Sequence, residues 1–391
     1  MRLLPVLALT AGLLTVPATA NADGNHPVRF ATFNASLNRG AAGQLVTDLS
    51  TPDNAQAREV AEVIQRNRPD VLLINEFDYA PAAADLFRDN YLERGQNGAK
   101  PINYPYAFIA PSNTGVLTGF DLDRNGSTNT GNDAHGFGLF EGQYGMLVLS
   151  KYPIDTRKAR TFQHFLWKDM PNAMLPDDPA TAAPKDWYSP EILNVLRLSS
   201  KSHGDVPVKV GRETVHFLVS HPTPPTFDGA EDRNGTRNND EIRFWADYTT
   251  PGKGRYIYDD KGRRGGLSSS AKFVVAGDNN SDPLDGDSVP GAIDQLLDAP
   301  RVLDPHPGSR GGVLAAQTQG GANTTHEGNP YFDTADFNDT APGNLRVDYV
   351  LPSKGLLPVR GAVYWPTDEL ARLNDASDHH LVWQDVLVSR R

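Results

Sequence analysis

Residues 373–388 read LNDASDHHLVWQDVLV, with Asp378, His379 and His380 standing directly before a run of apolar residues. The apolar run is typical of a buried β-strand. Two imidazoles beside a carboxylate can belong to a polar surface, to a metal site or to an acid–base pair. Which of these applies depends on whether other strands of the chain end in matching groups.

Other segments of the chain also combine an apolar, strand-like run with a polar residue near one end. Each is a short run rich in Val, Leu, Ile and Phe, as expected of buried strands, and most have a polar residue at or beside one end. The segments are VRFATFN (28–34), DVLLINE (70–76), YGMLVLS (144–150), VHFLVSH (215–221), KFVVAGDNN (272–280), RVDYVLP (346–352) and HHLVWQDVLV (379–388).

Helical periodicity falls between these strands. It occurs at 51–67, 82–95, 238–250 and 290–300, and we expect Thr51 to cap the first helix. Helices interleaved with buried strands predict sheets that are covered by helices.

The composition limits the kinds of site that the chain can build. The 391 residues include no cysteine, so disulfides and thiolate metal sites are excluded. A tightly held ion must use oxygen or imidazole ligands, which favours hard cations. The formal net charge of −11 is unfavourable for long-range attraction of a polyanion, although a bound cation can reverse the field locally.

Residues 1–22 have the three-part pattern of a secretory signal peptide, with Arg2, an apolar run and then small residues. We expect cleavage near Ala20 or Ala22 and a secreted, extracellular product. Residues 23–391 are expected to form a single domain, because elaborated two-sheet folds reach this length with one core. No later segment is apolar for long enough to span a bilayer, and no obligate protein partner is evident.

Three polar stretches, near 111–142, 155–190 and 223–238, interrupt the pattern as loop insertions. Structureless connections of this length in a compact domain are usually functional or disordered. Their Trp, Phe and His content favours order.

Several strand ends carry candidate functional side chains. Asn34 and Glu76 each close a strand, and either one alone is more often a solvated or capping residue than a ligand. Gly277 permits a tight turn after a third strand, so that Asp278 and Asn280 can face one crevice. The alternative for Asp278 is a simple Asx-turn.

Asp348 lies inside an otherwise apolar strand, where an unpaired carboxylate is costly. His379 is the natural partner, because a buried carboxylate fixes the tautomer of the ring and raises the basicity of its other nitrogen. The alternative is a structural ion pair with Arg346.

The ordered blocks TFN, INEF, YGMLVLSKYPI, VSHPTPP, GDNN, RVDYVLPS and SDHH resemble the signature blocks of the endonuclease/exonuclease/phosphatase superfamily, which includes pancreatic deoxyribonuclease and neutral sphingomyelinases. The resemblance spans about residues 28–388. It implies a deoxyribonuclease I-like α+β fold, a four-layer α-β-β-α sandwich of two mixed sheets. It also implies a metal-dependent phosphoesterase that uses Mg²⁺ or Mn²⁺.

The resemblance assigns metal ligands residue by residue. Glu76 matches the main Mg²⁺ ligand of the family, and Asn34 and Asp378 match residues that complete the metal neighbourhood, largely through water. His380 is expected to face the core or to lie behind the ligands, and it is not assigned a catalytic role.

The resemblance also assigns catalytic residues. Asp278 and Asn280 match the pair that positions the nucleophilic water and a phosphate oxygen. His379 matches the histidine that is paired with the carboxylate Asp348, and His221 matches a donor to the phosphate or the leaving oxygen. Removal of the water proton is assigned jointly to Asp278 and His379.

The insertion at 223–238 follows His221 directly and is longer than the corresponding loop of better-known relatives. Arg233 or Arg237 could grip a substrate phosphate through two hydrogen bonds. Equally, both could hold a proline-rich loop in place by pairing with its aspartates.

The insertion at 111–142 contains DLDRNG, with Asp121, Asp123 and Asn125, which is the opening of an EF-hand-like Ca²⁺ loop. It departs from that pattern because the twelfth position is Asn132 rather than Glu. A solvated turn is the favoured interpretation, with a structural Ca²⁺ site as the alternative.

The insertion at 155–190 carries Trp167, Trp187 and Tyr188. Such rings beside a phosphoesterase groove can stack on nucleobases. More often they pack a long loop against the body of the protein.

The leading hypothesis is therefore a secreted phosphodiesterase whose substrate is nucleic acid, a lipid or a small phosphodiester. A phosphomonoesterase and a sphingomyelinase-like lipid phosphodiesterase are alternatives within the family. Two hypotheses from other classes are an inactive extracellular Ca²⁺-binding protein on the same fold and an unrelated metallohydrolase that uses His379 and His380.

Overall fold

The larger sheet of the protein joins strands from both ends of the chain. The structure is a computed structural model that describes residues 26–388, so the expected signal peptide lies outside the described residues. Six strands run in the order β12-β13-β1-β2-β4-β3, and only β1 and β2 are parallel neighbours among them. The strands are β1 (Val28–Asn34), β2 (Val71–Asn75), β3 (Tyr106–Ile109), β4 (Met146–Ser150), β12 (Leu357–Val363) and β13 (Val382–Leu387).

The second sheet has five strands in the order β11-β8-β7-β6-β5, and β7 and β8 are its parallel pair. Its members are β5 (Arg160–Thr161), β6 (Gly204–Val210), β7 (Glu213–Val219), β8 (Lys272–Asp278) and β11 (Asp348–Pro352). A small separate ladder pairs β9 (Ala335–Asp336) with β10 (Asn344–Leu345).

The two large sheets pack face to face across an apolar core. Alternation along β2 sends Val71 and Leu73 into this core and Leu72 to the helix-covered face. Phe30 of β1 meets Phe217 of β7 in the middle, with ring centroids 5.6 Å apart.

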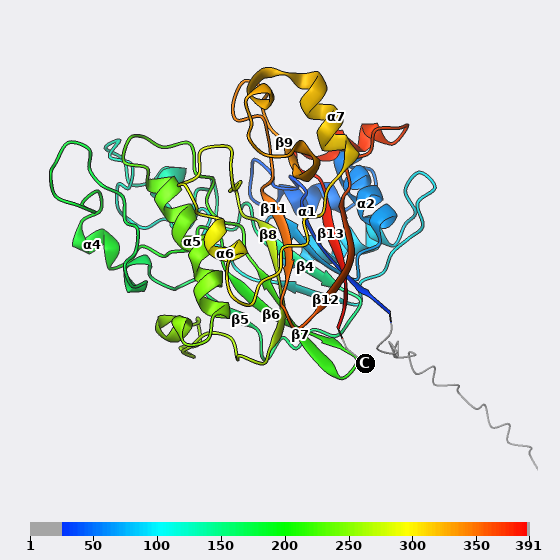
Figure 1. Ribbon diagram of the computed structural model, residues 1–391, viewed down its shortest axis with the longest axis horizontal. Helices are drawn as coiled ribbons and strands as arrows, with labels where there is room; N and C mark the ends of the chain where they lie inside the picture. The colour runs from blue at the N-terminus through cyan, green and yellow to red at the C-terminus, as the bar shows by residue number, and fades with distance from the viewer. Residues whose placement is uncertain (1–25, 389–391) are drawn as a thin grey trace, which may run out of the picture.

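Helices cover the outer face of each sheet, on the two sides of the molecule in Figure 1. One layer contains α1 (Gln44–Leu49), α2 (Ala55–Asn67) and α3 (Pro81–Phe87), which continues as a π-helical turn over Arg88–Leu92. The other contains α5 (Arg233–Thr249) and α6 (Asp294–Leu297). The order helix, sheet, sheet, helix confirms the expected four-layer α+β sandwich.

Three expected helix starts were wrong, and the helix expected at 290–300 begins only at Asp294. The cap of α2 is Asn54, whose side chain accepts a hydrogen bond from the Ala57 amide, because residues 51–53 form a turn instead. α5 begins at Arg233, several residues before the expected start at 238, because Asp228 accepts a hydrogen bond from the Asn234 amide at 2.6 Å.

Residues 305–345 form a projection that the sequence pattern did not predict. It contains α7 (Arg310–Gln319), β9 and β10, and it stands at the top of Figure 1 beside β11. A separate short helix, α4 (Pro190–Leu193), lies at the outer end of the 155–190 insertion. Within residues 26–388, no helix has the length and apolar character needed to cross a membrane.

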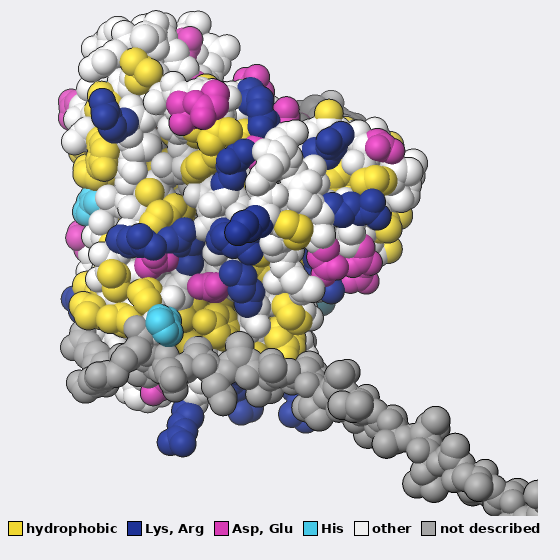
Figure 2. Space-filling model, turned by 90° about the vertical axis from the view of Figure 1, so that its right-hand side faces the viewer, with side chains coloured by type: hydrophobic (Ala, Val, Ile, Leu, Met, Phe, Trp, Pro, Cys, Tyr) yellow, Lys and Arg dark blue, Asp and Glu magenta, His cyan; other side chains and the backbone are white. Residues whose placement is uncertain are grey.

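The surface carries mixed charges. On the face in Figure 2, Lys and Arg side chains are interrupted by Asp, Glu and apolar side chains. Ion pairs also join neighbouring strands: the buried Asp385 of β13 accepts from both Arg29 at 2.7 Å and Arg360 at 2.8 Å.

Candidate active site

Strand direction brings the polar strand ends to one edge of the sandwich. Asn34 ends β1 and Glu76 follows the parallel strand β2, while Asp278 ends β8. Asp348 begins β11 opposite Asp278, because these two residues are register partners in an antiparallel pair. β13 is antiparallel to β1 and therefore starts at the same edge, shortly after His379.

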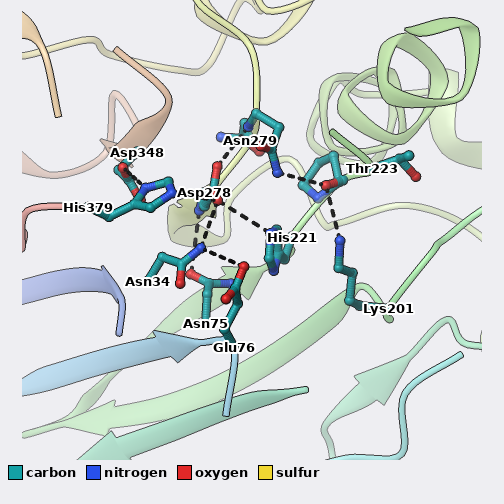
Figure 3. Close-up of polar contacts among 12 residues, drawn as sticks. Asn34, Asn75, Glu76, Lys201, His221, Thr223, Asp278, Asn279, Asp348 and His379 are labelled. Carbon is teal, nitrogen blue, oxygen red and sulfur yellow. Dashed lines mark hydrogen bonds and ion pairs between the residues drawn. The ribbon is translucent and has the colours of Figure 1, made fainter. Parts of the chain in front are cut away.

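Asn34 links the carboxylates of the two sheets. Its Nδ2 donates to Glu76 Oε1 and to Asp278 Oδ2, both at 3.1 Å (Figure 3). Its Oδ1 accepts from the Ser36 amide at 3.2 Å. Glu76 has φ of 58°, a left-handed backbone that is uncommon for a side chain of this size and that directs the half-buried carboxylate away from the strand.

The Asp278 carboxylate contacts the imidazole rings of both His221 and His379. Its Oδ2 lies 3.3 Å from His221 Nε2 and 3.6 Å from His379 Nε2. All three side chains are buried. The arrangement places one carboxylate oxygen between two groups that can each hold a proton.

His379 is also held from its other side. Its Nδ1 lies 2.8 Å from Asp348 Oδ2, and that same oxygen accepts from Thr334 Oγ1 at 2.9 Å. The alternative pairing of Asp348 with Arg346 is wrong, since Arg346 Nη2 donates to Asp304 at 2.5 Å.

Burial and charge act against each other at these groups. Burial alone would raise the pKa of Asp278, but His379 and His221 outweigh it and the pKa is lowered. Burial alone would lower the pKa of His379, but Asp348 and Asp278 raise it well above its usual value. The pKa of His221 is lowered by burial and by Lys201. The three groups therefore differ in proton affinity within one hydrogen-bonded cluster.

Asn280 lies beside this cluster, with a positive φ of 50°. Its amide donates to Asp278 Oδ1 at 2.8 Å and its Nδ2 to the Pro222 carbonyl at 3.1 Å. The neighbouring Asn279 is fully buried, and neither polar atom of its side chain has a hydrogen-bond partner among the described residues.

Asp378 lies on the solvent-exposed side of the site. Its side chain is exposed and its carboxylate accepts from Ser36 Oγ at 3.3 Å. Within residues 26–388, no hydrogen bond joins it to Asn34 or Glu76. The adjacent His380 is buried and stacks on Trp365 with centroids 3.8 Å apart, as expected of a core residue.

Asn75 and Lys201 are among the polar residues of the site that the sequence analysis missed. Asn75 joins the sheets, because its Oδ1 accepts from the Asp278 amide at 3.4 Å and its Nδ2 donates to the Ser220 carbonyl at 3.3 Å. An Asn ending an apolar strand directly before Glu76 was the available signal. Lys201 is buried beside His221 with its Nζ 3.5 Å from the Pro222 carbonyl, and no local pattern marked it.

A pocket of about 560 Å³ opens beside Glu76 and His221. Its volume is in the range of small-molecule sites. Its other walls include residues of all three expected insertions, among them Phe137, Tyr188 and Arg233. Trp167, in contrast, is fully buried and donates to Asp240 at 2.7 Å, so it packs its loop against the body.

The acidic loop at 121–133 folds back on itself. Oxygen atoms of Asp121, Asp123 and Asp133 lie within 4.8 Å of one another. The Asn125 amide donates to Asp121 Oδ1 at 3.1 Å and to Asp123 Oδ1 at 3.3 Å, while its side-chain Oδ1 accepts from the Ser127 amide at 2.8 Å. Asp133 was not among the expected ligands, because it lies one position beyond the twelfth residue of the pattern.

The donor set at the sheet edge suits a hard cation. Glu76 has an amide as its only hydrogen-bond partner and makes no ion pair among the described residues. Asp278, Asp348 and His379 also offer ligand atoms within 4.8 Å of one another. His379 Nδ1 is already engaged by Asp348, so the Glu76 side of the cluster is the better place for a cation.

Comparison with known proteins gives one family match. The model of the Endonuclease/Exonuclease/phosphatase family matches residues 18–379. No curated protein matches the chain.

Several solved structures are similar in outline. An endonuclease/exonuclease/phosphatase from Beutenbergia cavernae is 16% identical, with 92% of this chain and 71% of that chain covered and a TM-score of 0.49. Sphingomyelinase C from Streptomyces griseocarneus is 17% identical, with 92% and 99% covered and a TM-score of 0.46. Beta toxin from Staphylococcus aureus, in a structure with bound magnesium ions, is 13% identical, with 92% and 99% covered and a TM-score of 0.45. Because the family match covers most of the sequence, the chain belongs to the Endonuclease/Exonuclease/phosphatase family.

Proposed function

We propose that the protein hydrolyses phosphodiester bonds by water attack with the help of a divalent cation, Mg²⁺ or Mn²⁺. Members of its family are typically hydrolases of phosphoester bonds. The observation that carries the proposal is the continuous contact network from Glu76 through Asn34 and Asp278 to His379 and Asp348. Acidic and imidazole groups from two sheets converge there beside a pocket large enough for a substrate.

Glu76 is the first ligand in this proposal, with Asp278 beside it and Asn34 available if its amide turns its oxygen inward. A bound cation would supply positive charge that stabilises the phosphoryl oxygens. Asp378 is exposed and turned toward Ser36, which supports an outer role through water over direct coordination.

Side chains of the site accept the proton of the attacking water and stabilise the charge that develops on the phosphate. Asp278 and His379 share removal of the water proton, and Asp348 holds the ring of His379 in one orientation. His221 donates to the phosphate or the leaving oxygen, and Asn280 helps to orient the attacked group. Attack on a phosphodiester needs each of these functions, since charge builds on the phosphoryl and leaving oxygens.

The test is hydrolysis of bis(p-nitrophenyl) phosphate and p-nitrophenyl phosphate with Mg²⁺, Mn²⁺, Ca²⁺ or EDTA. We expect divalent-dependent hydrolysis of the diester and a loss of roughly 10²- to 10⁴-fold in kcat for His379→Ala. His306→Ala is the control, because His306 is an exposed histidine paired with Asp304. No divalent-dependent activity in the wild type, or full activity in His379→Ala, would overturn the proposal.

The same assay separates the alternatives. A phosphomonoesterase would prefer the monoester, and an inactive Ca²⁺-binding protein would hydrolyse neither compound. Nucleic acid and sphingomyelin follow as substrates, which distinguishes a nuclease from a lipid phosphodiesterase.

Export is a further part of the proposal. The pattern of residues 1–22 supports a cleaved signal peptide. Sequencing the N-terminus of protein from the culture medium tests it, and a first residue other than one near Asn21 or Asp23 would contradict it.

A further inference from the structure

The pocket beside Glu76 and His221 is lined in large part by the three segments that the sequence pattern marked as insertions. The segment 111–142 contributes Leu122 and Phe137, and the segment 155–190 contributes Tyr188. The first turns of α5 contribute Arg233 and Arg237. Its walls therefore combine apolar and aromatic surface with basic groups.

Two of the basic groups are buried without an ion-pair partner. Lys201 is 7% exposed and Arg237 is 9% exposed. Lys201 Nζ has the Pro222 carbonyl as a partner at 3.5 Å, and Arg237 donates to the carbonyls of Leu198 and Arg197, both at 2.8 Å, and of His135. Within residues 26–388, no carboxylate lies at ion-pair distance from either cation.

Burying a cation without a carboxylate partner is unfavourable. The carboxylate that acts on both cations from farther away is Glu241. Its oxygens are already occupied, since they accept from the Ser200 amide and from the Thr223 amide, each at 2.6 Å. Burial lowers the pKa of both Lys201 and Arg237. Glu76 and Asp278 also act on Lys201 from a distance. Both cations thus line the pocket without a carboxylate at contact distance among the described residues.

The third basic side chain of the pocket, Arg233, already has a carboxylate partner. Arg233 pairs with Glu231, and Asp228 caps the first turn of α5. Arg233 can therefore contribute a hydrogen bond to a ligand, whereas Lys201 and Arg237 have no contacting carboxylate among the described residues and are the cations that an anionic ligand would pair with.

The geometry points to a second anionic subsite: the pocket binds a phosphate group of the substrate other than the one that is hydrolysed, held by Lys201 and Arg237 with help from Arg233. The part of the substrate that links the two phosphates lies against Tyr188 and Phe137. The inference rests on the proposed phosphodiesterase function and names its substrate class, a phosphodiester that carries a further phosphate. The pocket volume of about 560 Å³ leaves room for both groups.

The test uses two matched pairs of p-nitrophenyl phosphodiesters, each pair with and without a terminal phosphate. One pair has thymidine as the linking group, and the other has glycerol, which is flexible. We expect the wild type to prefer the phosphate-bearing member of at least one pair by about tenfold or more in kcat/KM, as for a charge-assisted contact.

Lys201→Met should reduce this preference to near unity, because Met keeps the length of the buried chain and removes the charge. Arg233→Gln is a second variant with a smaller expected loss, and it avoids the three carbonyl contacts that Arg237 provides. Lys209→Met is the matched control, because Lys209 lies on β6 and donates to Thr214 at 2.7 Å, away from the pocket. It should keep the wild-type preference.

The outcomes separate this inference from the proposed function. Absence of diester hydrolysis in the wild type would contradict the function itself. Hydrolysis of both members of both pairs at equal efficiency would leave the function standing and overturn the second subsite. A preference that survives unchanged in Lys201→Met and Arg233→Gln would also overturn it.

Discussion

The pKa of a buried carboxylate in this protein is lowered or raised according to the charge of its neighbours. Asp278 has imidazoles within contact distance and a lowered pKa. Asp333 is also buried, but burial and the nearby carboxylates of Asp282 and Asp285 raise its pKa to about 8. At neutral pH the first is ionised and the second is held largely in the neutral form.

Asp333→Asn is expected to stabilise the protein at high pH. An aspartate ordinarily has a pKa of 3.8, whereas burial raises the pKa of Asp333 in the folded protein to about 8, so between these values the folded state binds more protons than the unfolded state. Stability therefore falls as pH rises through this window, and the neutral amide removes the fall. We expect a gain on the order of 1–3 kcal/mol at pH 8 that shrinks toward pH 4.

Urea unfolding at several pH values measures this effect. Asp298→Asn, at an exposed position, is the control and should change stability little at any pH. A gain of equal size across the whole range, or a loss at pH 8, would contradict the expectation.

At the level of elements, the projection at 305–345 supports the candidate site from one side. Ala335 of β9 forms a bridge with His379, and Phe337 packs edge-on against the His379 ring with centroids 5.2 Å apart. Thr334 Oγ1 donates to Asp348 and accepts from the amides of Val347 and Asp348 at 3.0 Å each. An element absent from the expected strand pattern therefore positions two groups that the pattern did identify.

Thr334→Val is expected to lower kcat by about tenfold to a hundredfold. It leaves two buried amides without an acceptor and removes one of the two hydrogen bonds that hold the Asp348 carboxylate in place. KM should change much less, since Thr334 does not line the pocket. The pH–rate profile should also shift, because Asp348 sets the proton affinity of His379. Thr340→Val, at an exposed position in the same projection, is the control. Equal effects of the two variants would argue against a positioning role for Thr334.

At the scale of the whole molecule, the candidate site depends on how the two sheets pack. The shared core that contains Phe30 and Phe217 fixes the edge at which β1 and β8 end together. This one core between the sheets supports the proposal of a single domain. Because the cluster of ligands exists only when both sheets are packed, a cation that binds there should stabilise the whole fold.

Mg²⁺ or Mn²⁺ is therefore expected to raise the melting temperature of EDTA-treated protein. At a cation concentration of about 100 Kd the gain is roughly 2.7 kcal/mol, which corresponds to a rise of a few degrees for a protein of this size. Glu76→Gln should lose most of the rise, whereas Glu93→Gln, at an exposed position, should keep it.

Differential scanning calorimetry measures both shifts. The same rise in Glu76→Gln and the wild type would remove Glu76 from the metal site. A rise with Ca²⁺ that is lost in Asp121→Asn and kept in Glu76→Gln would assign Ca²⁺ to the acidic loop instead.

The sequence pattern by itself determined the apolar strands, the polar residues at their ends and the presence of sheets covered by helices, whereas the four-layer sandwich was implied by the resemblance of the ordered blocks to a known family. These features are local, because the hydrophobic pattern and the terminal residues of each strand can be recognised from that short segment alone. Only the tertiary structure decided that Asp348 pairs with His379 rather than Arg346, that Asp378 turns outward and that Lys201 and Arg237 share a pocket. These outcomes depend on contacts between segments far apart in the chain, which sheet packing creates and no local pattern encodes.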